Sequence, residues 1–94
     1  MASPEVTHNP DESRYEAWVD GSLAGFSAYE IDGPRIIFTH TEVEDAYEGQ
    51  GIGGALARAA LDDVRERGGL RVVPRCPFIK SWMDENPDYL DLRR

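Results

Sequence analysis

The sequence contains very little cysteine and lysine. One cysteine among 94 residues cannot form an intramolecular disulfide, which agrees with a reducing compartment, and we expect a cytoplasmic protein. Lys and Arg together number 10 against 18 Asp and Glu, so the formal net charge is −8. Nucleic-acid binding depends on clustered cations. The charge balance therefore argues against a nucleic-acid partner.

Long apolar runs and metal-ligand patterns are also missing. No apolar segment approaches the roughly 20 residues of a membrane-spanning helix, and the N-terminus lacks the basic-then-apolar pattern of a signal peptide. No membrane association is expected. His, Cys, Asp and Glu never recur at the spacing of a metal site, so no bound metal is expected. The length allows one domain with one core.

The first residues differ in composition from the rest. Residues 1–13 contain Pro4, Pro10 and few apolar side chains, which predicts a flexible N-terminal tail. His8 lies in this segment, and we assign it no role. Residues 14–94 form the predicted folded domain.

Three strands are predicted directly after the tail. Apolar and polar residues alternate over residues 14–19, 23–31 and 35–43, and Asp-Gly pairs between these segments favour tight turns. The pattern predicts an antiparallel meander, with a bulge expected at Gly25.

A helix, a fourth strand and a second helix follow. Residues 55–67 are rich in alanine and place apolar side chains three and four positions apart, which predicts a helix. Residues 70–73 should form a strand parallel to 36–43, because a strand–helix–strand crossover joins the two. Pro77 begins a short last helix. The predicted fold class is α+β.

A glycine-dense segment lies between the third strand and the first helix, and it reads Glu48-Gly49-Gln50-Gly51-Ile52-Gly53-Gly54. Glycines let the backbone approach a ligand closely, and the free N–H groups and dipole of a helix start attract anions. The order strand, glycine loop, helix therefore predicts a phosphate site. Neither the P-loop nor the dinucleotide fingerprint fits, since no lysine follows Gly54 and the third glycine comes one residue early.

The loop resembles the pyrophosphate loop Gln/Arg-x-x-Gly-x-Gly/Ala of the GNAT superfamily of acetyl-CoA-dependent N-acetyltransferases, with Glu48, Gly51 and Gly53 at its fixed positions. Residues 40–43 and 70–78 look like the corresponding parts of small single-domain GNAT-like proteins, and the resemblance extends over residues 14–92. Glu48 departs from the pattern, and we expect its carboxylate to turn toward solvent because like charges repel.

The resemblance implies that acetyl-CoA is the co-substrate. The residues it assigns to the cofactor are Val43, Gly49, Gln50, Gly51, Ile52, Gly53 and Gly54. It also gives the backbone near Val43 the task of stabilising an oxyanion. In the GNAT fold the two central parallel strands splay apart to admit the pantetheine arm, and Pro74, which lacks an N–H, would promote such a split. The alternative is a strand that simply ends at a proline.

Aminolysis of a thioester needs a base, an oxyanion site and often a proton for the thiolate. His40 and Glu42 share a strand face with Phe38 in the predicted pattern and are candidate bases; the alternative is a solvated sheet face. Cys76 is a candidate acid, an acetyl-accepting nucleophile or a packing residue. Tyr89 is either the acid that the resemblance implies or a core aromatic.

Three functions remain open from the sequence. The first is an N-acetyltransferase that acts directly on a primary amine, and an acidic surface would favour a cationic acceptor. The second is a non-catalytic acyl-CoA-binding module that acts with a partner protein, and the third is a thiol enzyme built on Cys76 and His40. The chain is shorter than a complete GNAT fold, so we expect an open or partner-completed acceptor site and regard a homodimer as an option.

Overall fold

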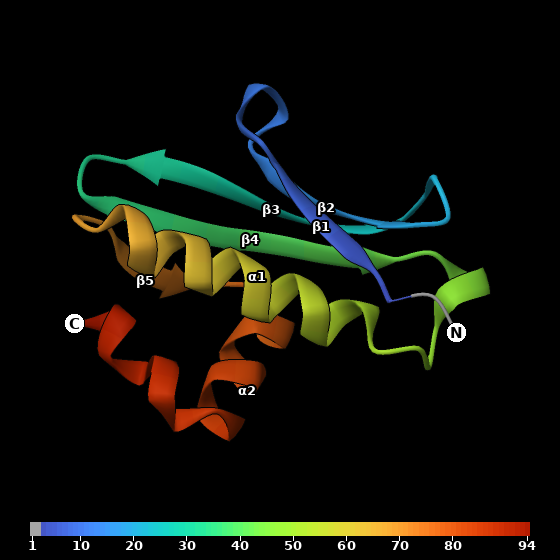
Figure 1. Cartoon of the computed structure of the whole chain (residues 1–94). Coiled ribbons are helices and arrows are strands. Elements are labelled where there is room, and N and C mark those ends of the chain that lie inside the picture. The colour runs from blue at the N-terminus through green and yellow to red at the C-terminus, as the bar shows by residue number, and fades with distance from the viewer. Residues whose placement is uncertain (1–2) are drawn as a thin grey trace.

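The structure is a computed structural model that describes residues 3–94. One sheet with the strand order β1-β2-β3-β4-β5 forms one layer, and the helices lie against it and below its β5 edge (Figure 1). The strands are β1 (Glu5–Asn9), β2 (Arg14–Val19), β3 (Ser22–Asp32), β4 (Arg35–Val43) and β5 (Arg71–Pro74). The α-helices are α1 (Ile52–Arg67) and α2 (Pro77–Glu85), and short 3-10 helices are η1 (Pro10–Glu12), η2 (Asp45–Tyr47) and η3 (Pro87–Arg93).

The pairing of the strands follows from their connections. β1 to β4 pair antiparallel in sequence order through short turns, whereas β5 pairs parallel with β4 because α1 carries the chain back across the sheet. The predicted meander, glycine loop, helix, parallel strand and last helix are all present. The predicted α+β fold class is confirmed.

The structure corrects the prediction of a flexible tail over residues 1–13. β1 pairs with β2 along its whole length, and η1 connects the two strands. Val6 packs against the core and His8 stacks on a tyrosine ring, so this segment is part of the fold. The segment has few apolar side chains, so its composition does not indicate a strand. Ladder hydrogen bonds to β2 stabilise it instead. Residues 1 and 2 lie outside the described part.

A bulge in β4 corrects the predicted face of the candidate base residues. The β3–β4 register shifts between the pairs Tyr29–Phe38 and Ala28–His40, which leaves Thr39 as the extra residue. Phe38 is fully buried, whereas the His40 side chain is 60% exposed. A bulge reverses the alternation of side chains beyond it. His40 and Glu42 therefore lie on the sheet face opposite to Phe38.

A second irregularity lies next to Gly25, close to where a bulge was predicted. The β2–β3 register skips Ala24. A Cβ atom built on Gly25 would stand 2.6 Å from the carbonyl oxygen of Glu42, 3.2 Å from the Cα of Val43 and 3.3 Å from Cγ2 of Ile52. Glycine is required here because the end of β4 and the start of α1 both approach this point.

The core lies between the sheet and α1, with α2 and η3 packed beside α1. α1 buries one stripe of small and medium side chains, which are Ile52, Leu56, Ala57, Ala60, Leu61 and Val64. Ile79 and Met83 of α2 are fully buried in the same core. Within residues 3–94, no helix has both the length and the apolar character needed to cross a membrane.

Candidate functional site

The predicted phosphate loop has the backbone of an anion site. Gly49 and Gly51 have φ angles of +81° and +78°, a region that strains residues with a Cβ atom. Gly51 is the N-cap of α1, and its carbonyl accepts the first helical hydrogen bond from the Ala55 N–H at 3.0 Å. The N–H groups of Ile52 to Gly54 precede that bond and point out of the helix start.

Gly53 lies in close contact with an aromatic side chain. A Cβ atom on Gly53 would stand 2.7 Å from Cζ of Phe78, so the phenyl ring lies directly against the first turn of α1. Phe78 belongs to α2 and is 41% exposed. Sequence reasoning did not single out Phe78, because only the packing of α2 beside α1 brings the ring to the loop.

A cavity of about 380 Å³ opens between the end of β4, the loop and α2. Its lining residues are Val43, Tyr47, Glu48, Gly49, Gly51, Ile52, Gly53, Gly54 and Phe78. Six of the seven predicted cofactor residues are thereby brought together. The seventh, Gln50, is exposed and its amide donates to the Ala46 carbonyl at 3.4 Å. The cavity combines backbone N–H donors with the apolar walls of Val43 and Phe78.

Next to this cavity, β4 extends beyond the end of β5, its parallel neighbour. The last β4–β5 pair joins Phe38 and Pro74, and the Cys76 N–H then donates to the Phe38 carbonyl at 2.8 Å before the chain enters α2. The edge of β4 beyond Phe38 therefore has no β5 neighbour in the described residues. β5 ends at Pro74, which both interpretations of the proline predicted.

The backbone direction at Val43 suits the oxyanion role that the resemblance gave it. The Glu44 N–H donates to the Ala24 carbonyl on β3 at 2.8 Å, and Glu44 is extended. Successive N–H groups of a strand point to opposite sides. The Val43 N–H therefore points away from β3, toward the edge that β5 leaves open.

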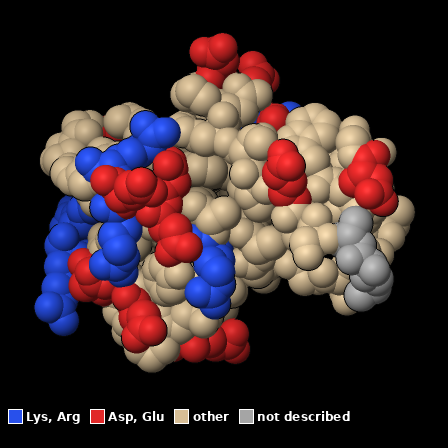
Figure 2. All heavy atoms as spheres, in the orientation of Figure 1, with Lys and Arg blue, Asp and Glu red and all other residues tan. Residues whose placement is uncertain are grey.

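The charge around the loop is acidic. No Lys or Arg occurs between Arg35 and Arg58, and this stretch carries the acids Glu42, Glu44, Asp45 and Glu48. On the face shown in Figure 2, most Lys and Arg side chains gather on the left, where β5 and the C-terminal helices lie. Among the described residues, no Lys or Arg lines the cavity, so backbone N–H groups would hold an anion at the loop.

The structure separates Cys76 from the candidate bases. Cys76 is 3% exposed, and its Sγ lies 3.4 Å from the Thr41 Oγ1, which itself lies 2.9 Å from the buried Ser27 Oγ. His40 and Glu42 lie together on the opposite sheet face, with 3.6 Å between Nε2 and Oε1. The structure therefore forms no thiol–imidazole pair between Cys76 and His40, and the thiol-enzyme hypothesis loses its basis.

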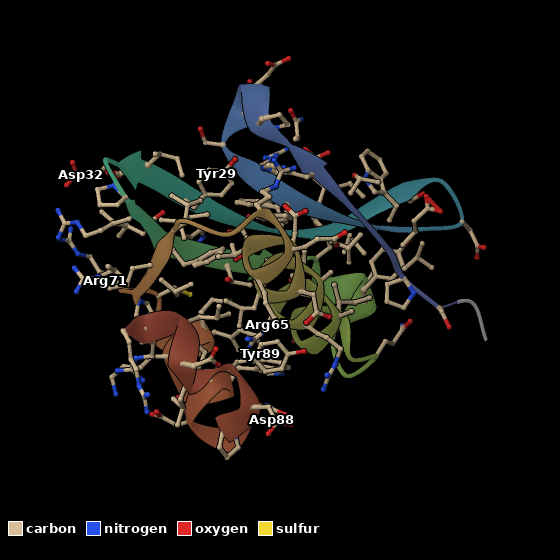
Figure 3. The ribbon with its side chains drawn as sticks, turned by 60° about the vertical axis from the view of Figure 1, so that its left-hand side comes forward. Tyr29, Asp32, Arg65, Arg71, Asp88 and Tyr89 are labelled. Atoms are coloured by element: carbon tan, nitrogen blue, oxygen red, sulfur yellow. The ribbon has the colours of Figure 1, made fainter. Side chains whose placement is uncertain are left out.

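Tyr89 of η3 packs beside α1, with 5.1 Å between its ring centroid and that of Trp82. Its hydroxyl donates to Asp62 Oδ1 at 2.7 Å and accepts from Arg58 at 3.2 Å, and Figure 3 shows its ring beside Arg65. Asp62 is roughly 15 Å along the helix axis from Ile52, at 1.5 Å per residue. The hydrogen bond to Asp62, followed by burial, raises the pKa of Tyr89. Its hydroxyl is thus engaged with Asp62 and Arg58, and Tyr89 does not line the cavity at the loop.

Among residues 3–94, no group of three His, Cys, Asp or Glu side chains could hold a metal ion.

A mixed sheet whose central parallel strand runs through a glycine loop into a helix start defines an α+β domain of the acyltransferase type. Residues 14–92 match the model of the GCN5-related N-acetyl-transferase family, and the chain belongs to this GNAT family.

Relatives of known structure and sequence agree with this assignment. The fold is similar to a ribosomal-protein-alanine N-acetyltransferase from Brucella melitensis biovar Abortus 2308, with a TM-score of 0.60, 25% identity, and coverage of 86% of this chain and 60% of that one. The chain is also 50% identical to Protein NATD1 of Bos taurus over 60 residues, which is 63% of this chain and 52% of that protein. With Protein NATD1 of Danio rerio it shares 33% identity over 84 residues, 87% of this chain and 76% of that protein. The chain spans about half the length of the mammalian relatives it matches.

Proposed function

We propose that this chain binds acetyl-CoA at the glycine loop and transfers the acetyl group directly to a primary amine. The observation that carries the proposal is the cavity at the end of β4, which joins free N–H groups at the α1 start to an apolar wall. A pyrophosphate with an attached apolar arm needs both features in this order. Acetyl-CoA would supply the activated acetyl thioester.

The residues that would act on the reactants lie along β4. The loop backbone from Gly49 to Gly54 would hold the phosphates, and the outward Val43 N–H would stabilise the developing oxyanion. Glu42 lines a separate hollow of about 260 Å³ that shares Val43 with the cofactor cavity. We assign Glu42 the role of accepting the amine proton, with His40 orienting its carboxylate.

The acceptor in this proposal is a positively charged amine. The hollow next to Val43 also contains the carboxylates Glu44 and Asp45, which attract a cation before it loses its proton. A small amine, a polyamine, a lysine side chain and a protein N-terminus all meet this requirement.

A matched pair of glycine variants tests cofactor binding. Gly51 and Gly33 both have positive φ angles, and a methyl group at either position would meet no other atom within 4 Å. Gly51→Ala and Gly33→Ala should therefore cost similar stability, about 1 to 2 kcal/mol each. Isothermal titration with acetyl-CoA should show binding lost or at least tenfold weaker in Gly51→Ala and unchanged in Gly33→Ala. No binding to the unaltered protein would refute the proposal.

A second function is favoured by one observation. The Cys76 thiol faces Thr41 and the Tyr89 hydroxyl is committed to Asp62, so neither candidate acid points into the cavity. A non-catalytic acyl-CoA-binding module would need no such acid. Acetyl-CoA binding without CoA release across a broad panel of amines would support this alternative.

A further inference from the structure

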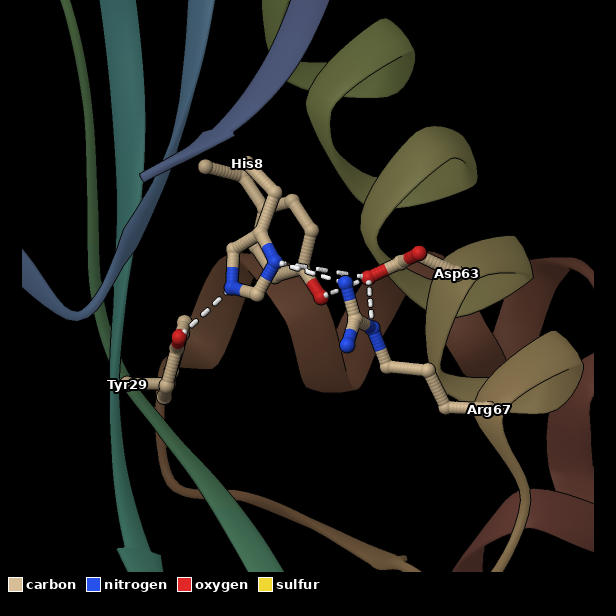
Figure 4. A network of polar contacts seen from close by, with 5 residues as sticks. His8, Tyr29, Asp63 and Arg67 are labelled. Carbon is tan, nitrogen blue, oxygen red and sulfur yellow. Dashed lines mark hydrogen bonds and ion pairs between the residues drawn. The ribbon is translucent and has the colours of Figure 1, made fainter. Parts of the chain in front are cut away.

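A cluster of polar and aromatic side chains ties β1 to the rest of the fold, far from the glycine loop. It comprises His8 of β1, Tyr15 of β2, Tyr29 of β3, and Asp63 and Arg67 of α1 (Figure 4). We call it the His8 cluster. Asp63 lies roughly 16 Å along α1 from Ile52, at 1.5 Å per residue.

The contacts of the cluster converge on His8 and Asp63. His8 Nε2 lies 2.6 Å from the Tyr29 hydroxyl, and His8 Nδ1 lies 3.1 Å from an Arg67 Nη2. Tyr15 and Arg67 both donate to Asp63 Oδ2 at 2.7 Å. The imidazole stacks on the Tyr15 ring, with 4.4 Å between centroids and 12° between planes.

These contacts determine the protonation state of His8. A guanidinium can only donate, so Nδ1 must accept the hydrogen bond from Arg67 and carries no proton. The proton of the neutral imidazole is therefore on Nε2 and is donated to the Tyr29 oxygen. A second proton, on Nδ1, would remove the acceptor and place two cationic N–H groups against each other.

The charged groups that contact the imidazole or line the hollow beside it belong to α1. Asp62, Asp63 and Glu66 line a hollow of about 270 Å³ next to His8, and Asp63 Oδ2 lies 3.7 Å from His8 Nδ1. The groups that face His8 from β2 and β3 are the tyrosines, and burial raises the pKa of both. Burial and then the Arg67 cation lower the pKa of His8, while Asp63 opposes them. The net effect favours the neutral form.

We propose that the His8 cluster is an acid-sensitive latch that holds β1 on the sheet while His8 is neutral and releases it when His8 takes up a proton. β1 is an edge strand of five residues whose single neighbour in the sheet is β2, so loss of the anchor to β3 and α1 leaves it held by its pairing with β2 and by the packing of Val6. Its release bares the edge of β2, which can then pair with another strand.

The direction of the pH effect follows from linkage. Because the pKa of His8 is lowered from 6.5 in the folded state, the released strand binds the proton more readily than the latched one. The latch is therefore fully effective above about pH 6.5 and weakens as the pH falls below that value. At pH 5 the opening constant should rise by up to about 30-fold relative to neutral pH.

Hydrogen exchange of β1 tests the latch. Exchange in the full chain is followed by mass spectrometry at pH 7.5 and pH 5.0, with rates corrected for intrinsic pH dependence. Protection of β1 should fall at pH 5.0 while protection of β3 and β4 stays constant. His40→Gln should behave like the unaltered protein, because His40 lies on the opposite face. His8→Gln can still donate to Tyr29 and accept from Arg67, so its β1 protection should not depend on pH.

A spectroscopic readout covers the case in which His8→Gln loosens β1 at both pH values. In His40→Gln, His8 is the one remaining imidazole, and long-range ¹⁵N–¹H spectra report its tautomer and its protonation. The Nε2–H tautomer is expected at pH 7.5, and protonation should coincide with loss of β1 protection. Protonation of His8 with β1 still protected would overturn the proposal, and so would an unchanged acid response in a folded His8→Gln.

Discussion

The two ends of α1 differ in how their polar groups are paired. At its start, the backbone N–H groups of Ile52 to Gly54 face a cavity, and no Lys or Arg occurs nearby in sequence. Toward its end, Asp63 and Arg67 bond each other and side chains from two strands, Tyr15 of β2 and His8 of β1. Polar groups left unpaired are costly unless a ligand completes them. The first end is therefore the one for which we propose ligand binding, whereas the second anchors β1 and β2 to the helix.

Removal of the Asp63 carboxylate should show the largest effect on stability. Asp63→Ala leaves the Tyr15 hydroxyl and the Arg67 guanidinium without their shared acceptor, which should lower the free energy of unfolding by about 2 kcal/mol. Urea denaturation measures the loss. Acetyl-CoA affinity, measured on the folded variant, should be unchanged; weaker binding would show that the two ends of α1 are coupled.

Truncation of Phe78 should affect binding but hardly stability. The ring lies on Gly53 and borders the cavity, so Phe78→Ala removes an apolar wall and should weaken acetyl-CoA binding by about tenfold, as loss of a ring contact of 1 to 2 kcal/mol would. Ile31 is the matched control, because it is also exposed, at 55%, but lies outside the cavity lining. Titration calorimetry should show unaltered affinity in Ile31→Ala. If the unaltered protein, Phe78→Ala and Ile31→Ala bind acetyl-CoA with equal affinity, Phe78 is not part of the binding site.

Replacement of the buried thiol should leave turnover within about threefold of the unaltered protein. A bound amine and a thioester already gain the advantage of proximity, so Cys76 need not carry the acetyl group. Cys76→Ser tests this with a CoA-release assay. Intact-protein mass spectrometry after incubation with acetyl-CoA alone should show no stoichiometric adduct. An adduct on the unaltered protein that discharges on amine addition would point to a covalent route.

The smallest effect is expected at Glu48. Its exposed carboxylate borders the cavity and repels an anionic ligand through solvent, so Glu48→Gln should leave acetyl-CoA affinity equal or tighten it by up to about threefold. Added salt should reduce the difference in acetyl-CoA affinity between Glu48→Gln and the unaltered protein. A loss of more than tenfold would assign the carboxylate a positive role in binding.

The sequence predicted the parts of the fold that local patterns encode. Alternation over β2, β3 and β4, the glycine loop and the period of α1 each depend on neighbouring residues, and so does the end of β5 at Pro74. Six of the residues that the resemblance assigned to the cofactor also line one cavity.

The parts that were missed depend on distant partners. His8 and Arg67 are 59 positions apart in the chain, so nothing near His8 indicates that it is anchored. The extra residue Thr39 is defined only by its register with β3, and it reverses the face of His40. Phe78 reaches Gly53 only through the packing of two helices. Tertiary contacts of this kind override local patterns.

Gly25 has a consequence for the width of the site. Its missing side chain leaves the gap into which the Glu42 carbonyl, Val43 and Ile52 all fit, so this residue of β3 sets how far the end of β4 stands from the start of α1. A methyl group at this position would push the end of β4 away from the start of α1. The cavity opening would widen, although the methyl group itself would not contact a ligand. The dimensions of the site are thus controlled from a neighbouring strand that contributes no residue to its lining.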